Sequence, residues 1–328
     1  MNTDITGIHH VTALSGPAGQ NLAFYTNVLG FRLVKKTVNF DDPHSYHFYF
    51  GDRGGRPGTL ITFFPHPGFR PGVAGAGEVA ATHLAVGPGA IGYWADRLKA
   101  AGVDAARQSA GGQERLRFTD PDGTRLSLVE AAGGPAEGHA PASDVPADQA
   151  ILGIASVTVV VNRLAPTAAF LTDTLGFRQV AAEGNRAWFE PTGGGDGGGP
   201  DDAGTAFVAG VPPLEVIEVP AAPRPVLGVG SVHHVAWRVA DDAARDRVRA
   251  AVDGKVLGLT PVKDRSYFRS IYFREPGHTI FEVATAGPGF AADEDPATLG
   301  TALKLPPQFE SRRAEIEAAL PPLEANPS

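Results

Sequence analysis

Gly-Ile-His-His-Val-Thr at residues 7–12 nearly recurs as Ser-Val-His-His-Val-Ala at residues 231–236. Each stretch places a pair of histidines in a short run that suits a half-buried strand. Neighbouring side chains on a strand point to opposite faces, so only one histidine of each pair can face a given site. Two such strands, far apart in the sequence, indicate a shared metal centre.

Composition narrows the classes of protein and of site. The chain of 328 residues is long enough for two ordinary domains. It has no cysteine, so any metal must be bound by His, Asp or Glu. The net charge of -8, without a basic cluster, argues against nucleic acid as a partner. No apolar run is long enough for a membrane helix, and the first residues lack the layout of a signal peptide. We therefore expect no membrane partner and a cytoplasmic location.

Internal repeats divide the chain into four units. Residues 7–34 align without a gap with residues 153–180, each copy giving a strand, a helix and then a glycine where a left-handed C-cap is favoured. The other two units begin with strands at residues 81–86 and 232–239. Each unit is predicted to fold as strand–helix–strand–strand–strand (βαβββ). The predicted helices cover residues 21–29, 90–101, 165–175 and 241–252.

Turn residues and alternation place the remaining elements. Asp-Pro-Asp-Gly-Thr at 120–124 and Glu-Pro-Gly-His-Thr at 275–279 predict hairpin turns in which glycine supplies a positive φ. Strands are predicted at 31–38, 45–50, 59–64, 177–181, 186–190 and 205–209. Residues 131–150 are predicted to be a linker and residues 193–199 a loop. The expected division is a domain at 1–135 (units one and two), a domain at 150–290 (units three and four), and a tail at 291–328. A short helix near 307–320 should pack the tail back over a domain.

This plan, with histidines on first strands and a glutamate on a last strand, resembles the vicinal oxygen chelate (glyoxalase/extradiol dioxygenase) superfamily. Residues 7–12, 232–235 and 264–277 (Asp-Arg-Ser-Tyr-Phe-Arg-Ser-Ile-Tyr-Phe-Arg-Glu-Pro-Gly) more closely resemble the hydroquinone ring-cleaving dioxygenases. The resemblance runs from about residue 6 to the tail helix. It implies an α+β fold in which four βαβββ modules form two barrels.

The repeats indicate which units share a metal. The first-strand position of units one, two, three and four is aligned as His10, His83, Ser156 and His234. On the last strand, Glu282 of unit four aligns with Ser127 of unit two. Only units one and four together provide two histidines and a carboxylate. We therefore predict that modules 1 and 4 share the metal cup and that modules 2 and 3 form a metal-free barrel.

His10, His234 and Glu282 are thus the predicted ligands, and the resemblance points to the same three residues. Two imidazoles and one carboxylate form the facial triad of non-haem Fe(II) oxygenases, and the same ligands accept Mn(II). His83 and His47 are assigned to structural packing.

Residues that flank the ligands are the candidates for catalysis. Thr12 shares the face of His10 and can hydrogen-bond a substrate or a ligand. His9 and His233 each precede a ligand: a regular strand would leave them in the core, whereas the resemblance places them in the active site, which requires a bulge. The resemblance also implies that Arg265 anchors the substrate and that Tyr272 is an acid/base or hydrogen-bonding group. The alternatives are a solvated charge and a core aromatic residue.

The expected function is an Fe(II)-dependent ring-cleaving dioxygenase that opens a hydroquinone (para-diphenol) ring with O2. A catechol-type extradiol dioxygenase would take its ligands from units three and four, where Ser156 removes a histidine. A glyoxalase-like lyase or isomerase would bring a second carboxylate ligand. The alternative of a different class is a non-catalytic aromatic-ligand or drug-binding protein of the same superfamily. The expected partners are a small aromatic substrate and O2, and association into a homo-oligomer stays open.

Overall fold

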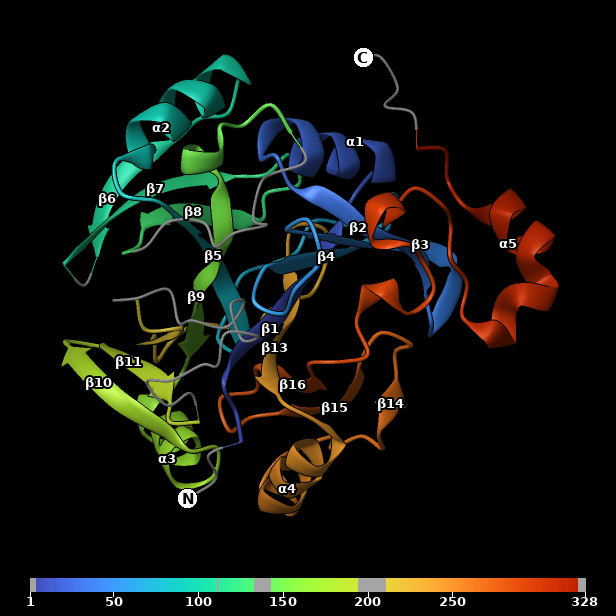
Figure 1. The fold of residues 1–328 in the computed structure, drawn as a ribbon. Coiled ribbons are helices and arrows are strands. Elements are labelled where there is room, and N and C mark those ends of the chain that lie inside the picture. The colour runs from blue at the N-terminus through green and yellow to red at the C-terminus, as the bar shows by residue number, and fades with distance from the viewer. Residues whose placement is uncertain (1–3, 111, 133–142, 194–210, 324–328) are drawn as a thin grey trace.

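A computed structural model of the chain describes residues 4–110, 112–132, 143–193 and 211–323. Its described strands form one mixed sheet of sixteen strands, and the helices lie around the outside (Figure 1). The α+β architecture of four βαβββ modules is confirmed. No helix in the described ranges has the length and apolarity that a bilayer crossing requires.

Each module begins with a long strand and a helix. Module 1 contains β1 (Gly7–Ser15), α1 (Ala18–Ala23), β2 (Arg32–Asn39), β3 (Asp42–Gly51) and β4 (Leu60–Pro65). Module 2 contains β5 (Glu78–Val86), α2 (Ala90–Ala100), β6 (Ala106–Ala110), β7 (Gln113–Thr119) and β8 (Arg125–Glu130). Module 3 contains β9 (Ile151–Val161), α3 (Leu164–Asp173), β10 (Phe177–Glu183), β11 (Arg186–Pro191) and β12 (Leu214–Glu218). Module 4 contains β13 (Val232–Val239), α4 (Asp242–Val252), β14 (Lys263–Asp264), β15 (Arg269–Arg274) and β16 (Ile280–Thr285).

One predicted helix has different bounds in the structure, and one predicted strand lies outside the described residues. The helix predicted at 21–29 begins three residues earlier, as α1, and continues as a π-helical turn over Phe24–Val28. The strand predicted at 205–209 lies outside the described residues, as do most of the loop at 193–199 and part of the linker at 131–150. The third strand after α3 is β12, which follows the undescribed segment.

The two hairpin turns differ in where the positive φ lies. Gly123 has a φ of 89° as predicted, but in the second turn the left-handed residue is His278, with a φ of 74°, and not Gly277. A Cβ at Gly277 would come within 2.7 Å of Glu275 Oε1 and 2.8 Å of Thr167 Oγ1. Glycine is therefore needed there for the close approach of neighbouring side chains, since the Glu275 carboxylate folds back over the turn.

First strands pair across the chain and not with the next module along it. β1 is antiparallel to β13, so modules 1 and 4 meet, and β5 is antiparallel to β9, so modules 2 and 3 meet. The ladder between these two strand pairs is short, with Val232 of β13 facing Val79 of β5. Further bonds join the two halves, such as that from the Ile154 N–H to the Gly58 carbonyl. We call the concave face formed by modules 1 and 4 the metal cup, and the concave face formed by modules 2 and 3 the second cup. The domain boundaries at 135 and 150 stay a prediction.

Bulges interrupt both strand pairs at matching places. In the first pair, the register skips His9 on β1 and His233 on β13. In the second pair it skips Ala80 on β5 and Ala155 on β9. A bulge residue is left unpaired and turns the strand locally, so the side chains on either side of it lose strict alternation.

The bulges also correct the predicted alignment of His83. At the centre of each pair Val11 faces Val235 and Thr82 faces Val157, so β5 and β13 are equivalent with residue 82 on residue 235. His83 therefore corresponds to Ala236, two residues beyond His234, and the equivalent of His234 is Ala81. Matching histidine to histidine gave the wrong register because it followed residue type, whereas the strand pairing sets the equivalence.

The tail packs back over module 1, as predicted. Its helical part is a 3-10 helix (Pro307–Arg312) followed by α5 (Arg313–Ala319). Earlier in the tail are two 3-10 turns (Phe290–Ala292 and Pro296–Thr298). Lys304 donates its backbone N–H to the carbonyl of Lys36 on β2. The buried Lys35 side chain is paired with Asp293 and Glu294 at the start of the tail.

Removal of the Lys35 cation should destabilise the fold. Lys35→Ala leaves Glu294, which is 4% exposed, without its partner. Breaking one side of a buried pair costs about 3 kcal/mol because a charge stays uncompensated. The free energy of unfolding measured in urea should fall by that amount. Lys36→Ala is the control, since that ammonium contacts only the exposed carbonyl of Thr301. Equal stability of the two variants would contradict the anchoring role.

Candidate metal centre

Three buried side chains from three strands meet in the metal cup. His10 comes from β1, His234 from β13 and Glu282 from β16, and one donor atom from each lies within 4.8 Å of the others. Glu282 Oε2 is 3.2 Å from His10 Nε2 and 2.8 Å from His234 Nε2. β16 runs parallel to β13 with Glu282 beside Ala236, which places the carboxylate next to His234 on the same face. The three residues predicted from the repeats are therefore brought together.

The burial and hydrogen bonding of the Glu282 carboxylate test whether a cation suits this site. It is fully buried, and neither oxygen accepts a hydrogen bond of regular geometry. Burial alone would raise the pKa of Glu282, but His10 and His234 hold it well below its usual value. An ionised buried carboxylate without donors is costly, and a bound cation removes that cost. Two imidazole nitrogens and one carboxylate oxygen are a donor set that suits Fe(II) or Mn(II).

His9 and His233 contact the outer nitrogens of the two ligand imidazoles. His9 Nδ1 lies 2.8 Å from His10 Nδ1, and His233 Nδ1 lies 2.7 Å from His234 Nδ1. If each ligand turns Nε2 toward a metal, its Nδ1–H can donate to the neighbouring histidine. Burial lowers the pKa of His9, and it lowers the pKa of His233 to about 3. Both histidines are thus neutral at physiological pH and able to accept.

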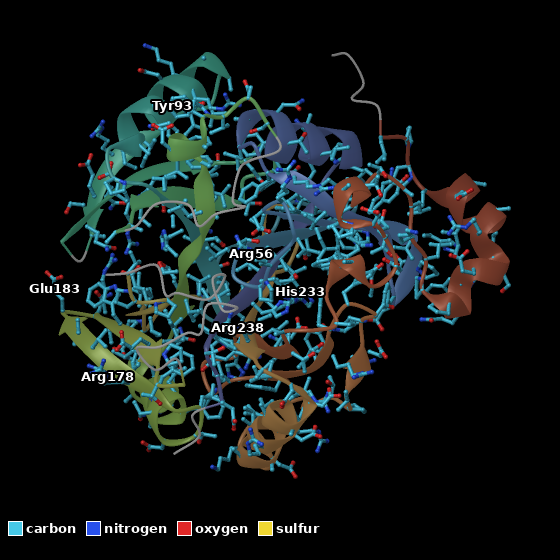
Figure 2. All side chains as sticks on the ribbon, in the orientation of Figure 1. Arg56, Tyr93, Arg178, Glu183, His233 and Arg238 are labelled. Carbon is cyan, nitrogen blue, oxygen red and sulfur yellow. The ribbon has the colours of Figure 1, made fainter. Side chains whose placement is uncertain are left out.

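The bulges produce this arrangement. Adjacent residues on a regular strand face opposite ways, yet each His-His pair forms a direct ring contact. His233 also lines the pocket in front of the metal cup, whereas His9 is buried behind it against Phe268. His233 lies near the middle of the molecule, far from Arg178 and Glu183 on the outer strand β10 (Figure 2).

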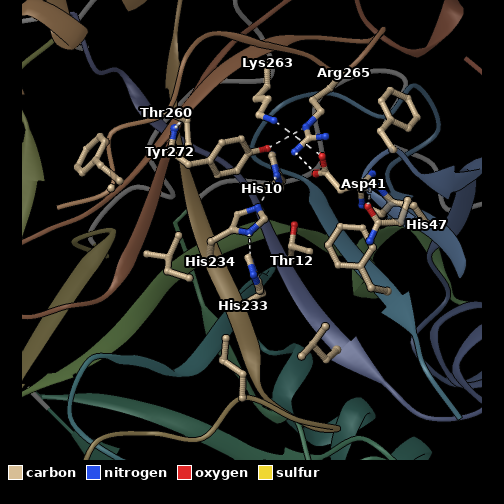
Figure 3. A pocket seen from close by; sticks show the side chains of 18 of the residues that line it. His10, Thr12, Asp41, His47, His233, His234, Thr260, Lys263, Arg265 and Tyr272 are labelled. Atoms are coloured by element: carbon tan, nitrogen blue, oxygen red, sulfur yellow. Dashed lines mark hydrogen bonds and ion pairs between the residues drawn. The ribbon is translucent and has the colours of Figure 1, made fainter. Parts of the chain in front are cut away.

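A pocket of about 790 Å³ opens in front of the predicted ligands His10 and His234 (Figure 3). Thr12, Arg265 and Tyr272 line it as well. Much of the remaining wall is apolar or aromatic, with Leu14, Phe64, Phe69, Leu227, Leu257, Phe268, Phe273 and Ile280. The volume accommodates a substituted aromatic ring, and apolar walls with few polar groups are typical of small-molecule sites.

Arg265 and Tyr272 form one polar unit at the rim of the cup. Arg265 Nε donates to the Tyr272 hydroxyl at 3.2 Å, and its NH2 group donates to Asp41 at 3.1 Å. Burial, and then the Glu282 charge, raise the pKa of Tyr272 well above its usual value, against the opposing effect of Arg265. Tyr272 therefore keeps its proton at neutral pH. Because its oxygen already accepts from Arg265, its O–H is free to donate to another group.

A second polar chain lies on the module 1 side of the pocket. The hydroxyls of Thr12 and Thr62 are 2.8 Å apart, and His47 Nε2 is 3.0 Å from Thr62. His47 does pack, as expected, between the rings of Tyr49 and Phe64, but it also lines the pocket. Thr12 thus faces the site as predicted, and its hydroxyl is oriented by Thr62.

Sequence reasoning missed two residues of the site, Asp41 and Tyr49. Asp41 follows β2 in a loop and gives no periodic signal, although it is the partner of Arg265. Tyr49 faces Thr62 across β3 and β4 in the same register as Tyr272 faces Glu282 across β15 and β16. It is therefore the module 1 equivalent of Tyr272. Carrying Tyr272 through the repeats, as was done for the ligands, would have found it.

Comparison with known proteins shows the family of this chain. The family described as "Glyoxalase/Bleomycin resistance protein/Dioxygenase superfamily" matches residues 7–128 and 153–283. "Putative ring-cleaving dioxygenase MhqO" of Bacillus subtilis (strain 168) is 41% identical over 97% of this chain and 96% of its own length. "Chlorohydroquinone/hydroquinone 1,2-dioxygenase" of Sphingobium indicum is 33% identical over 95% of each chain.

A solved structure shows the same fold along nearly the whole chain. The crystal structure of a dioxygenase candidate from Bacillus subtilis subsp. subtilis strain 168 superimposes with a TM-score of 0.89 at 40% identity. The match covers 98% of this chain and 99% of that one. The resemblance inferred from residues 7–12, 232–235 and 264–277 is confirmed. This chain belongs to the glyoxalase/bleomycin resistance protein/dioxygenase superfamily.

Proposed function

We propose that this protein is a metal-dependent ring-cleaving dioxygenase that opens a hydroquinone ring with O2, with Fe(II) bound by His10, His234 and Glu282. The observation that carries the proposal is the buried carboxylate of Glu282 beside two imidazole nitrogens at the base of an aromatic-lined pocket. The names of the two relatives support the reaction class, and one of them names hydroquinone.

Fe(II) held by His10, His234 and Glu282 would supply the binding and activation of O2 beside a phenolic oxygen of the substrate. The chain's own residues bind the ring, exclude water and control protons. Phe268 packs against both His9 and His10, with ring centroids 5.0 and 5.2 Å apart, and closes the floor of the pocket. Tyr272 packs edge-on against His234, with centroids 5.5 Å apart.

The Arg265–Tyr272 unit stabilises negative charge on the substrate. The Tyr272 O–H donates to a substrate oxygen, and the Arg265 cation, fixed by Asp41, strengthens that donor. Because Tyr272 retains its proton at neutral pH, it acts as a hydrogen-bond donor to that oxygen. This assigns the Tyr272 hydroxyl to stabilising the anion and the Arg265 charge to strengthening that donor.

His9 and His233 serve as positioning residues in this proposal. Each holds the Nδ1 of one ligand imidazole and so fixes its tautomer and ring orientation. Thr12 offers the pocket a hydroxyl from beside His10. The functional assignment thus includes all five predicted catalytic residues, with His9 acting through His10 and not on the substrate.

Oxygen consumption tests the reaction. The purified protein, reconstituted anaerobically with Fe(II) and in parallel with Mn(II), should consume O2 with hydroquinone and much less with catechol. Preference for catechol would reverse the substrate assignment. Ligand binding without O2 uptake for either diphenol would instead indicate a binding protein of the same superfamily.

Loss of the predicted carboxylate should abolish metal binding. Glu282→Gln removes the only negative charge of the triad, so the metal content after desalting should fall to near zero, and added Fe(II) should no longer raise Tm. Glu114→Gln is the matched control because Glu114 is exposed on β7, where it pairs with Arg107. A His10→Ala protein with wild-type metal content would refute the pairing of modules 1 and 4 at the metal.

Removal of the Tyr272 hydroxyl should slow the reaction without affecting the metal. In Tyr272→Phe we expect kcat to fall roughly 100-fold, the magnitude found for single donors to a developing anion. Metal content should stay unchanged because the hydroxyl contacts Arg265 and none of the three ligands. Tyr46→Phe is the control, since Tyr46 lies on β3 outside the pocket. A wild-type kcat in Tyr272→Phe would remove the tyrosine from the mechanism.

A further inference from the structure

The second cup repeats the framework of the metal cup with different chemistry. The equivalents of His10 and His234 are Ser156 and Ala81, which offer no imidazole. The two positions equivalent to Glu282 are Ser127 of β8 and Glu215 of β12, because both pair with the first strands in the register of Glu282. The sequence repeats had not revealed Glu215, whose strand follows the undescribed residues 194–210.

Guanidinium groups surround Glu215 in place of imidazoles. Arg115 NH1 lies 3.0 Å from Glu215 Oε2, and Arg186 NH1 lies 2.8 Å from Oε1. Thr158 donates to Glu215 at 2.7 Å, and His83 Nε2 is 2.8 Å from the Thr158 hydroxyl. Burial lowers the pKa of His83 to about 3, so this imidazole carries no charge at neutral pH. Two cations thus face one carboxylate.

The equivalence of the two cups also shows which positions of the metal cup correspond to these arginines. Arg117 faces Ser127 across β7 and β8 as Tyr272 faces Glu282 across β15 and β16. Arg186 lies two residues before Trp188, which pairs with Glu215 as Tyr49 pairs with Thr62, so Arg186 corresponds to His47. Positions that face the substrate pocket in the metal cup therefore hold arginines in the second cup.

These arginines line a cleft of about 530 Å³. The charged residues of its wall, among those described, are Arg115, Arg117, Arg125, Arg186, Asp104 and Glu215. The wall carries four positive and two negative side chains, and Glu78, which pairs with Arg125 at 3.6 Å, reduces the excess to one positive charge in a protein whose net charge is -8. Among the described residues, Arg117 hydrogen-bonds the uncharged amide of Gln108, so its charge is not neutralised by that contact. Apolar residues, including Phe118, Leu126, Val160 and Ile217, complete the wall.

We propose that the second cup binds a small organic carboxylate. Planar guanidinium groups pair with carboxylates in a bidentate manner, and the apolar wall suits the carbon skeleton of such a molecule. Arg115 and Arg186 are already fixed by Glu215, so little side-chain entropy is lost when an anion arrives. The site uses no residue of the metal cup and does not depend on the ring-cleaving function.

Calorimetric titration of the metal-reconstituted protein with benzoate tests the proposal, with benzamide as the uncharged analogue and inorganic phosphate as the competing anion. Benzoate should bind one per chain in the second cup, more weakly as salt rises, and benzamide should not bind. Arg117→Gln and Arg186→Gln should each weaken binding roughly ten- to hundredfold, the range expected for a lost charge-assisted hydrogen bond.

Two variants locate the site. Arg107→Gln changes an exposed arginine of β6 that lies outside the cleft and should leave benzoate affinity unchanged. Arg265→Gln changes the arginine of the metal cup, and a loss of binding there alone would place the anion at the metal and overturn the proposal. Absence of benzoate binding would overturn it as well. Phosphate binding as tight as that of benzoate would replace the carboxylate assignment by a general oxyanion site.

Discussion

The antiparallel contact between β1 and β13 is the constraint on which the site depends. It joins the first and the last module and places His10 beside His234, 224 residues later in the chain, with their Nε2 atoms 3.3 Å apart. β16 then adds the carboxylate by pairing in parallel with β13. The two bulges in this contact bring the preceding histidines into contact with the ligands. A regular ladder would have turned His9 and His233 away from them.

Each cup contains a carboxylate buried at the centre of a concave sheet, and this negative charge needs a nearby positive charge. In the metal cup two imidazoles lie beside Glu282, and a bound metal ion would balance its charge. In the second cup the guanidinium groups of Arg115 and Arg186 provide that positive charge. Equivalent positions of the repeated module thus place a buried carboxylate next to imidazoles in one cup and next to arginines in the other.

The repeats made the cluster of His10, His234 and Glu282 predictable because its residues differ between otherwise similar modules. His10, His234 and Glu282 could be selected from the sequence since only modules 1 and 4 provide all three donors. The long motif around Arg265 and Tyr272 supported the same site by resemblance. The bulges were not predictable, because an extra residue in one strand leaves no compositional trace. His83 was misaligned because histidine was matched to histidine. Asp41 was missed because it lies in a turn outside the repeated strands, and Glu215 was missed because its strand follows the undescribed residues 194–210.

The order of the ligands along the chain has a consequence for biosynthesis. His10 is synthesised in module 1 and Glu282 in module 4, and the tail that pairs with Lys35 follows Glu282. The aromatic residues of that region, Tyr267 and Phe290, pack together and against Tyr49 of module 1. A nascent chain therefore holds β1, with its parallel neighbour β4, before β13 has been made. His10, His234 and Glu282 can come together only after module 4 has been synthesised, and a translation product that stops before residue 282 lacks the carboxylate.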